Sequence, residues 1–176
     1  LVVLTGAAGL VVEGSLNGDP FRFTLVLLLL AMAGGSANAF NQVFERDVDA
    51  NMTRTRRRRP LPMKLIGVGE AYAFAGLVGL ASIAGFWYFF NLYSALLAAG
   101  TILFYSLYYT LYLKPRTPQN IVIGGAAGAM GPVIAWAAAA DALAVAPWLM
   151  FAIIFLWTPP HFWTLAIYHK KDYETV

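Results

Sequence analysis

Residues 38–62 read NAFNQVFERDVDANMTRTRRRRPLP, so an apolar helix becomes polar and then strongly basic. Asn41, Glu45 and Asp49 follow at four-residue steps, and each step advances about 40° beyond a full helical turn. With Asn38 three residues before Asn41, they form one polar stripe on a helix leaving an apolar layer. Two carboxylates and an amide on one face predict a Mg²⁺ site, because Mg²⁺ uses one or two carboxylates together with phosphate oxygens.

A basic run follows the stripe directly, at Arg54 and at residues 56–59. Guanidinium groups bind phosphate oxygens through paired hydrogen bonds. The pattern predicts an enzyme that acts on a diphosphate ester at a membrane surface. The alternative is a helix end that emerges into water, followed by a basic membrane anchor. Asp47 points away from Glu45, so we expect it to face solvent or to pair with an arginine.

The composition favours a polytopic α-helical membrane protein. The chain is 60% hydrophobic with a mean hydropathy of +0.65, above the usual balance of a soluble domain. The absence of cysteine excludes a disulfide framework, a thiol nucleophile and a thiolate metal site. Because the chain begins inside an apolar run and stops after a polar turn, we expect residues 1–176 to be a single transmembrane domain truncated at both ends.

The apolar runs predict one all-α bundle. Residues 1–12 are expected to end a span, a loop follows at 13–20, and a span starts near Phe21; further spans are expected at 65–90, 92–113, 119–140 and 143–168. Alternate loops then place eleven of the twelve basic residues on one side: Arg46, Arg54, Arg56, Arg57, Arg58, Arg59, Lys64, Lys114, Arg116, Lys170 and Lys171. Only Arg22 lies on the other side. The basic side is predicted to face the cytoplasm, or the mitochondrial matrix.

Residues 112–132, YLKPRTPQNIVIGGAAGAMGP, combine a basic turn with a glycine-rich helix. Lys114 and Arg116 share the side of the stripe, where they contact phosphate or simply anchor the turn. Asn120 is expected to cap the helix or to reach the site. The glycines favour close helix packing.

Residues 157–173, WTPPHFWTLAIYHKKDY, form the third polar segment. Pro159 and Pro160 are predicted to break the last span and to leave His161 beside a cavity, where it binds a ligand or is an ordinary hydrogen-bonded core residue. Lys171 and Asp172 offer a diphosphate contact and a second carboxylate arm, or else form a solvated helix end.

The three segments together resemble the UbiA superfamily of intramembrane prenyltransferases, and within it the branch that farnesylates haem. The first motif corresponds to Asn41, Glu45, Asp49, Met52, Arg54, Thr55 and Arg59-Pro60-Leu61; the second runs from Leu113 to Gly125; the third is Pro160-His161-Phe162-Trp163 with Lys171-Asp172-Tyr173. The interval from Arg54 to Pro60 is one residue longer than the family pattern, so either Arg58 or Arg59 fills the family position. The family has nine helices, of which about six are expected here.

The resemblance implies that Mg²⁺, held by Asn41, Glu45 and Asp49, binds farnesyl diphosphate and that the farnesyl group passes to a vinyl group of haem B, forming haem O. It implies a catalytic role for Arg54 and substrate contacts from Arg58, Arg59, Lys114, Arg116, Asn120, His161, Lys171, Asp172 and Tyr173. As the only histidine expected inside the membrane, His161 is the best candidate for an axial ligand of haem. The expected cavity lining includes Phe40, Phe44, Tyr105, Tyr108 and Tyr109.

The same resemblance implies a place in the bacterial inner membrane, or the mitochondrial inner membrane, with the lipid bilayer and haem A synthase as partners and no nucleic acid. Two other functions remain open. One is a quinone- or chlorophyll-type aromatic prenyltransferase with the same diphosphate site. The other is a membrane transporter that uses the stripe as an ion path, which predicts polar residues spread through several spans.

Overall fold

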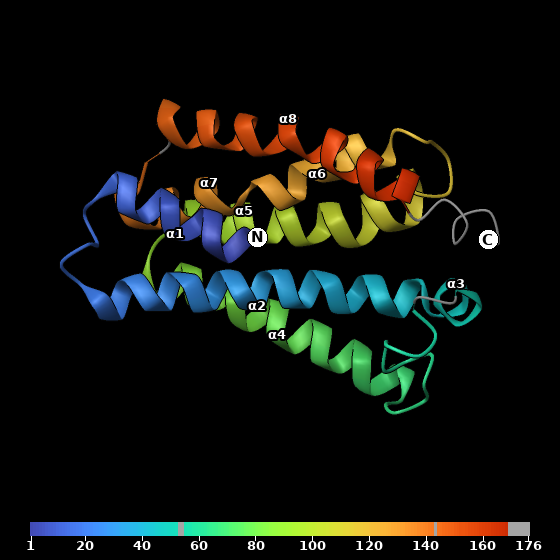
Figure 1. Cartoon of the computed structure of the whole chain (residues 1–176). Coiled ribbons are helices and arrows are strands. Elements are labelled where there is room, and N and C mark those ends of the chain that lie inside the picture. Colours follow the sequence, from blue (N-terminus) through green and yellow to red (C-terminus); the bar gives the residue numbers. More distant parts are fainter. Residues whose placement is uncertain (53–54, 143, 169–176) are drawn as a thin grey trace.

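The computed structural model describes residues 1–52, 55–142 and 144–168, and within these ranges every regular element is a helix (Figure 1). The elements are α1 (Val2–Glu13), α2 (Pro20–Phe44), α3 (Arg46–Asn51), α4 (Val68–Phe89), α5 (Leu92–Leu103), η1 (Phe104–Leu113), α6 (Asn120–Ala129), α7 (Gly131–Ala140) and α8 (Val145–Tyr168). Five stretches of the described chain are long and apolar enough to cross a membrane. The predicted all-α bundle is confirmed.

Two of the predicted spans contain irregular backbone. The span at 92–113 changes at Phe104 from α-helix to the π-helix η1. The span at 119–140 bends at Met130, between α6 and α7, because Pro132 has no N–H to donate to the carbonyl four residues earlier. Both irregular segments border the cavity described below, where non-helical backbone within a membrane protein is tolerated.

The double proline does not break the last span, contrary to the sequence-based prediction. α8 continues through Pro159 and Pro160. A proline ring fixes a φ angle that suits a helix, and its missing N–H costs one hydrogen bond to the preceding turn. Hydroxyl groups supply other bonds nearby: Thr158 Oγ1 donates to the Ile154 carbonyl at 2.7 Å, and Thr164 Oγ1 donates to the Pro160 carbonyl at 2.8 Å.

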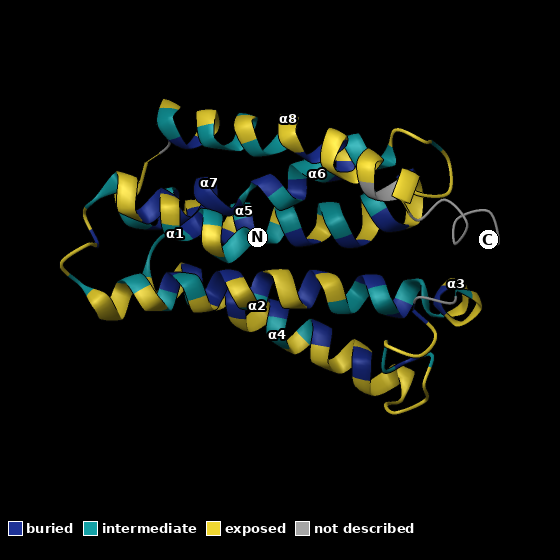
Figure 2. Cartoon of the chain, viewed as in Figure 1, coloured by how far each residue is buried: buried dark blue, intermediate teal, exposed yellow. Residues whose placement is uncertain are grey.

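Small residues let α2 and α4 approach closely. Ser36 Oγ donates to the Ala75 carbonyl at 2.7 Å, and Ser82 Oγ donates to the Leu29 carbonyl at 2.8 Å. Hydrogen bonds of this kind stabilise helix pairs where water is scarce. Figure 2 shows buried positions on the facing sides of the helices and exposed positions on their outer sides, as expected for a bundle surrounded by lipid.

The loops gather at two ends of the bundle (Figure 1). One end carries α3, the loop before α4 and the turn before α6, and it holds the described basic residues except Arg22. The other end carries the connections after α1, α4 and α7, where the Arg22 guanidinium lies 5.3 Å from the centre of the Phe90 ring. The described residues thus follow the predicted charge separation, and which end faces the cytoplasm stays a prediction.

Candidate functional site

The polar stripe spans the junction of α2 and α3. Glu45 lies between the two helices with φ −98° and ψ 7°, so the single helix expected from the sequence is interrupted there. The hydrogen-bond ladder continues nevertheless: the Glu45 N–H donates to the Asn41 carbonyl at 3.0 Å, and the Asp49 N–H donates to the Glu45 carbonyl at 2.8 Å. The three side chains therefore keep the register that their four-residue spacing predicts.

Two carboxylates and two cations meet on this stripe. The Lys114 ammonium donates to Glu45 Oε1 at 2.5 Å. Arg59 Nη1 donates to Asp49 Oδ2 and lies 3.9 Å from Glu45 Oε2. We call these four residues (Glu45, Asp49, Arg59 and Lys114) the charged cluster. Its formal charges cancel, and both carboxylate side chains are nearly buried, at 11% and 3% exposure.

The loop after α3 carries Arg59 into the charged cluster. Leu61 is buried against Val43 of α2 and Ala71 of α4. Thr55 is also buried, and its Oγ1 donates to the Asp49 carbonyl at 2.9 Å. Arg59 therefore faces the acidic pair, which places it rather than Arg58 beside the first motif. Arg58 is exposed, and its side chain has no partner among the described residues; Arg54 lies outside them.

Asn41 faces η1 rather than solvent. Its Nδ2 donates to Thr110 Oγ1 at 3.2 Å, and Thr110 Oγ1 in turn donates to the Tyr105 carbonyl at 2.8 Å. The amide is 4% exposed. Asn41 and Glu45 thus both contact the segment 110–114, so the stripe and the end of η1 form one polar wall.

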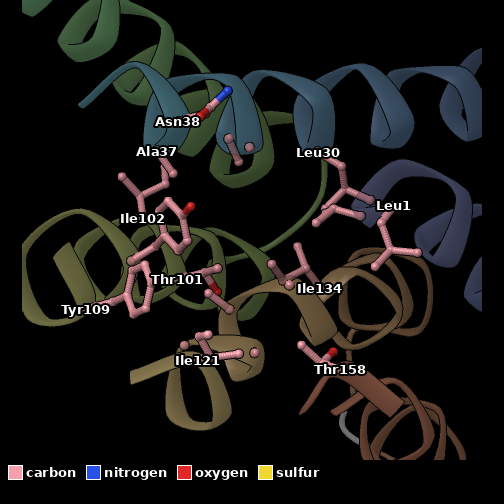
Figure 3. Close-up of a pocket in the computed structure, with 18 of the residues that line it drawn as sticks. Leu1, Leu30, Ala37, Asn38, Thr101, Ile102, Tyr109, Ile121, Ile134 and Thr158 are labelled. Carbon is pink, nitrogen blue, oxygen red and sulfur yellow. The ribbon is translucent and has the colours of Figure 1, made fainter. Parts of the chain in front are cut away.

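A cavity of about 530 Å³ lies between the start of α1, α2, η1 and the helices α5 to α8 (Figure 3). Tyr105 and Tyr109 line the cavity from η1, and Thr158 and His161 line it from α8. Small residues of α6 also line it. Its volume falls within the range of about 300–1,000 Å³ usual for small-molecule sites. Asn38, one turn before Asn41, and Tyr105 both line the cavity, so it begins where the polar wall ends.

His161 lies in the cavity lining and stacks on the Trp157 ring, with 4.3 Å between ring centroids. Its exposure argues against an ordinary core residue. A continuous helix, and not the expected break, brings it there. Lys171, Asp172 and Tyr173 lie outside the described residues.

Arg116 and Asn120 do not join the charged cluster. Arg116 Nη1 donates to the carbonyls of Leu111 and Tyr112, at 3.4 and 3.3 Å, and its guanidinium covers the Tyr112 ring at 4.4 Å. Asn120 Nδ2 donates to the Thr117 carbonyl at 2.7 Å and so holds the turn before α6. Both side chains support local backbone in this structure.

Three of the five aromatic residues expected in the cavity lie elsewhere. Phe40 and Phe44 stack on each other and contact Tyr72 of α4, while Tyr108 stacks on exposed Tyr112. Phe40 and Phe44 face α4 because they occupy the helix side next to the polar stripe. Sequence reasoning missed Trp157, Thr158 and Thr101 as lining residues, because nothing in the sequence indicates which side of α5 and α8 faces inward.

The sequence profile of the UbiA prenyltransferase family matches residues 2–176. The chain belongs to this family. Membership of the UbiA family and the five membrane-length apolar stretches of the described chain make it an integral membrane protein.

Relatives within the UbiA family carry a more specific name. A protoheme IX farnesyltransferase of Gluconacetobacter diazotrophicus is 49% identical over 174 residues, covering 98% of this chain and 54% of the relative. Proteins of the same name from Erythrobacter litoralis and Acidiphilium cryptum are 47% and 49% identical, covering 100% and 99% of this chain and 57% and 54% of those relatives. The chain therefore spans about half the length of the curated relatives it matches. No solved structure matches it significantly.

Proposed function

We propose that this protein transfers the farnesyl group of farnesyl diphosphate to a vinyl group of haem B, forming haem O. The observation that carries the proposal is a pair of nearly buried carboxylates beside an apolar cavity at the basic end of the bundle. The names of the relatives support this choice of donor and acceptor. A quinone- or chlorophyll-type acceptor would use the same diphosphate site.

The acidic pair has the chemistry of a Mg²⁺ site. The Glu45 and Asp49 carboxylates both approach one nitrogen of Arg59, so their oxygens converge on a common point. Among the described residues no third acidic, histidine or cysteine side chain gathers there. This donor set fits Mg²⁺, which takes one or two carboxylates and completes its shell with water and phosphate. Glu45 and Asp49 would hold the ion, with Asn41 beside them.

Bound Mg²⁺ would neutralise charge on the diphosphate leaving group. Arg59 and Lys114 lie where they can bind phosphate oxygens, and Arg54, Arg58 and Lys171 are proposed as further phosphate contacts. When the allylic C–O bond breaks, its electron pair leaves with the diphosphate and the farnesyl group becomes cationic. The rings of Tyr105 and Tyr109, which line the cavity, then shield that cation. The cation adds to the vinyl group of haem B, and the positive charge left on the former vinyl carbon takes up a water molecule and loses a proton, which gives the hydroxyethylfarnesyl side chain of haem O.

A transporter is the less favoured function. An ion path requires polar side chains along the length of several spans. Here the ion pairs that link separate elements all belong to the charged cluster, at one end of the described bundle. That distribution favours a membrane-surface enzyme with an apolar interior.

The metal assignment is tested with three variants of the purified protein. Asp49→Asn and Glu45→Gln remove carboxylate ligands, and each should lower Mg²⁺-dependent farnesyl transfer by on the order of 100-fold, comparable to the loss of one main stabilising group in an active site. Asp47→Asn is the matched control, because its side chain is 84% exposed and pairs only with Arg46, at 3.6 Å. Activity close to wild type in both site variants would exclude the assignment.

A further inference from the structure

Each carboxylate of the acidic pair already has a cationic partner. Asp49 accepts a hydrogen bond from Arg59, and Glu45 accepts one from Lys114 while Arg59 lies within ion-pair distance of it. A divalent cation approaching this pair meets a positive charge at three of its four carboxylate oxygens. It must also shed water, which Mg²⁺ does reluctantly. The pair in this state is a poor site for free metal.

We propose that Arg59 and Lys114 are exchangeable counter-ions that keep Mg²⁺ from the acidic pair until a diphosphate binds them. The proposal rests on the proposed function and adds to it an order of binding, in which the diphosphate must reach the cations before Mg²⁺ reaches the carboxylates. A diphosphate offers the two cations more negative charge than the carboxylates do, together with geometry suited to the guanidinium fork. Once they turn to phosphate, Glu45 and Asp49 are released to the metal.

Exposure across the charged cluster suits this exchange. The cation side chains are the outer members, with Lys114 at 44% and Arg59 at 26% exposure, whereas the carboxylate side chains are at 11% and 3%. A diphosphate arriving from the basic end therefore reaches the cations first. The backbone need not move, because Thr55 and the buried Leu61 anchor the loop on both sides of Arg59. Only the Arg59 and Lys114 side chains have to rotate.

The exchange couples two binding events. Each ligand removes the obstacle to the other, so metal and diphosphate should bind together far more tightly than either binds alone, with a coupling factor toward the upper end of the range of about 5–150 seen for linked sites. The protein would then select the metal–diphosphate pair and ignore free metal.

The test measures metal binding without turnover. Mn²⁺, which prefers the same oxygen ligands as Mg²⁺, is dialysed to equilibrium against purified protein with and without inorganic pyrophosphate. The excess of Mn²⁺ on the protein side measures binding, because pyrophosphate alone also removes free Mn²⁺ from solution. In the wild-type protein, pyrophosphate should tighten Mn²⁺ binding by about 100-fold. Lys114→Gln and Arg59→Gln should each bind Mn²⁺ alone at least about 10-fold more tightly than wild type, with a smaller coupling factor.

Two control variants, together with the choice of Lys114→Gln as a test variant, keep the result interpretable. Arg57→Gln removes an equal charge from an exposed residue whose side chain has no partner among the described residues, and it should leave binding of Mn²⁺ alone unchanged. Arg59→Lys keeps the charge and should restore exclusion of the metal. Lys114→Gln leaves Arg59 with both carboxylates, so it tests the proposal even where Arg59→Gln fails to fold.

The outcomes separate this proposal from the proposed function. Tight binding of Mn²⁺ alone to the wild-type protein, unchanged in Lys114→Gln and Arg59→Gln, would overturn the counter-ion exchange and leave the metal site intact. No binding of Mn²⁺ by folded wild-type protein, with or without pyrophosphate, would overturn the proposed function as well.

Discussion

Gly124 and Gly128 both lie in α6 and both line the cavity, yet their surroundings differ. A methyl group at Gly124 would overlap the ring of Tyr109 on η1, whereas a methyl group at Gly128 would meet nothing within 4 Å. Gly124 thus allows the close approach of α6 and η1 that was expected from the glycine-rich sequence. Gly128 instead leaves open space beside the cavity.

Gly124→Ala should therefore destabilise the protein by about 1–3 kcal/mol, the usual cost of overpacking, and should displace Tyr109 toward the cavity. Gly128→Ala is the matched control and should be neutral or stabilising by up to about 1 kcal/mol, because alanine favours a helix more than glycine does. Thermal unfolding of the two variants in detergent measures the difference. Equal melting temperatures would mean that η1 and α6 are not in close contact.

His161 offers a second comparison at the scale of one residue. If it positions or ligates haem, His161→Ala should weaken haem binding, seen as the loss of a Soret shift, while farnesyl diphosphate binding near the charged cluster persists. If it only supports packing, both ligands should weaken together with stability. Unchanged haem binding in a stable variant would remove His161 from the proposed site.

The four-residue spacing of Asn41, Glu45 and Asp49 was enough to predict their shared face, because backbone hydrogen bonds enforce that register even across the interruption at Glu45. The choice of Arg59 over Arg58 was not predictable. It depends on the burial of Leu61 between α2 and α4. Contacts between residues so far apart in the sequence cannot be predicted from a local sequence pattern. The hydrogen bond between Asn41 and Thr110 could not be predicted for the same reason.

At the scale of helices, the lengths of the apolar runs predicted the spans well, but the prediction that the double proline breaks α8 was wrong. Two adjacent prolines remove two backbone hydrogen bonds, yet α8 keeps its course through them. Threonine hydroxyls bond to the backbone close by, and cavity-lining positions lie one residue before and one after the pair. A sequence pattern alone does not show whether the surrounding structure tolerates the two missing hydrogen bonds.

The α2–α4 pair provides a test at this scale. A methyl group at Gly79 would lie 2.5 Å from Ser36 Oγ, so Gly79→Ala should push the helices apart, weaken the Ser36–Ala75 hydrogen bond and cost about 1–3 kcal/mol. Gly76→Ala, one turn earlier on α4, meets nothing within 4 Å and should not destabilise the protein. Denaturant or thermal unfolding of both variants provides the comparison. A stable Gly79→Ala protein would show that the two helices pack less tightly than described.

For the whole molecule, the distribution of basic residues among the loops agrees with the arrangement of helices in the bundle, because both follow from the number of membrane crossings. A chain that crosses a membrane repeatedly must return its loops to alternate sides, so a correct list of spans also fixes which loops share an end. The cavity could not be anticipated in this way. It depends on how the helices lean against one another and on the bend between α6 and α7, which are properties of the assembled bundle.

The basic end should face the cytoplasm, or the matrix in a mitochondrion, because the described basic residues other than Arg22 lie there. The chain contains no cysteine, so single cysteines report position without background. Met63→Cys and Gln119→Cys mark the basic end, whereas Gly18→Cys and Ala142→Cys mark the other; all four positions are exposed. In intact cells, a membrane-impermeant maleimide should label only Gly18→Cys and Ala142→Cys, and permeabilised cells should show all four.

Labelling of Met63→Cys and Ala142→Cys from the same side would mean that the span count is wrong. The reverse pattern, with only the basic end labelled, would keep the fold and invert its orientation.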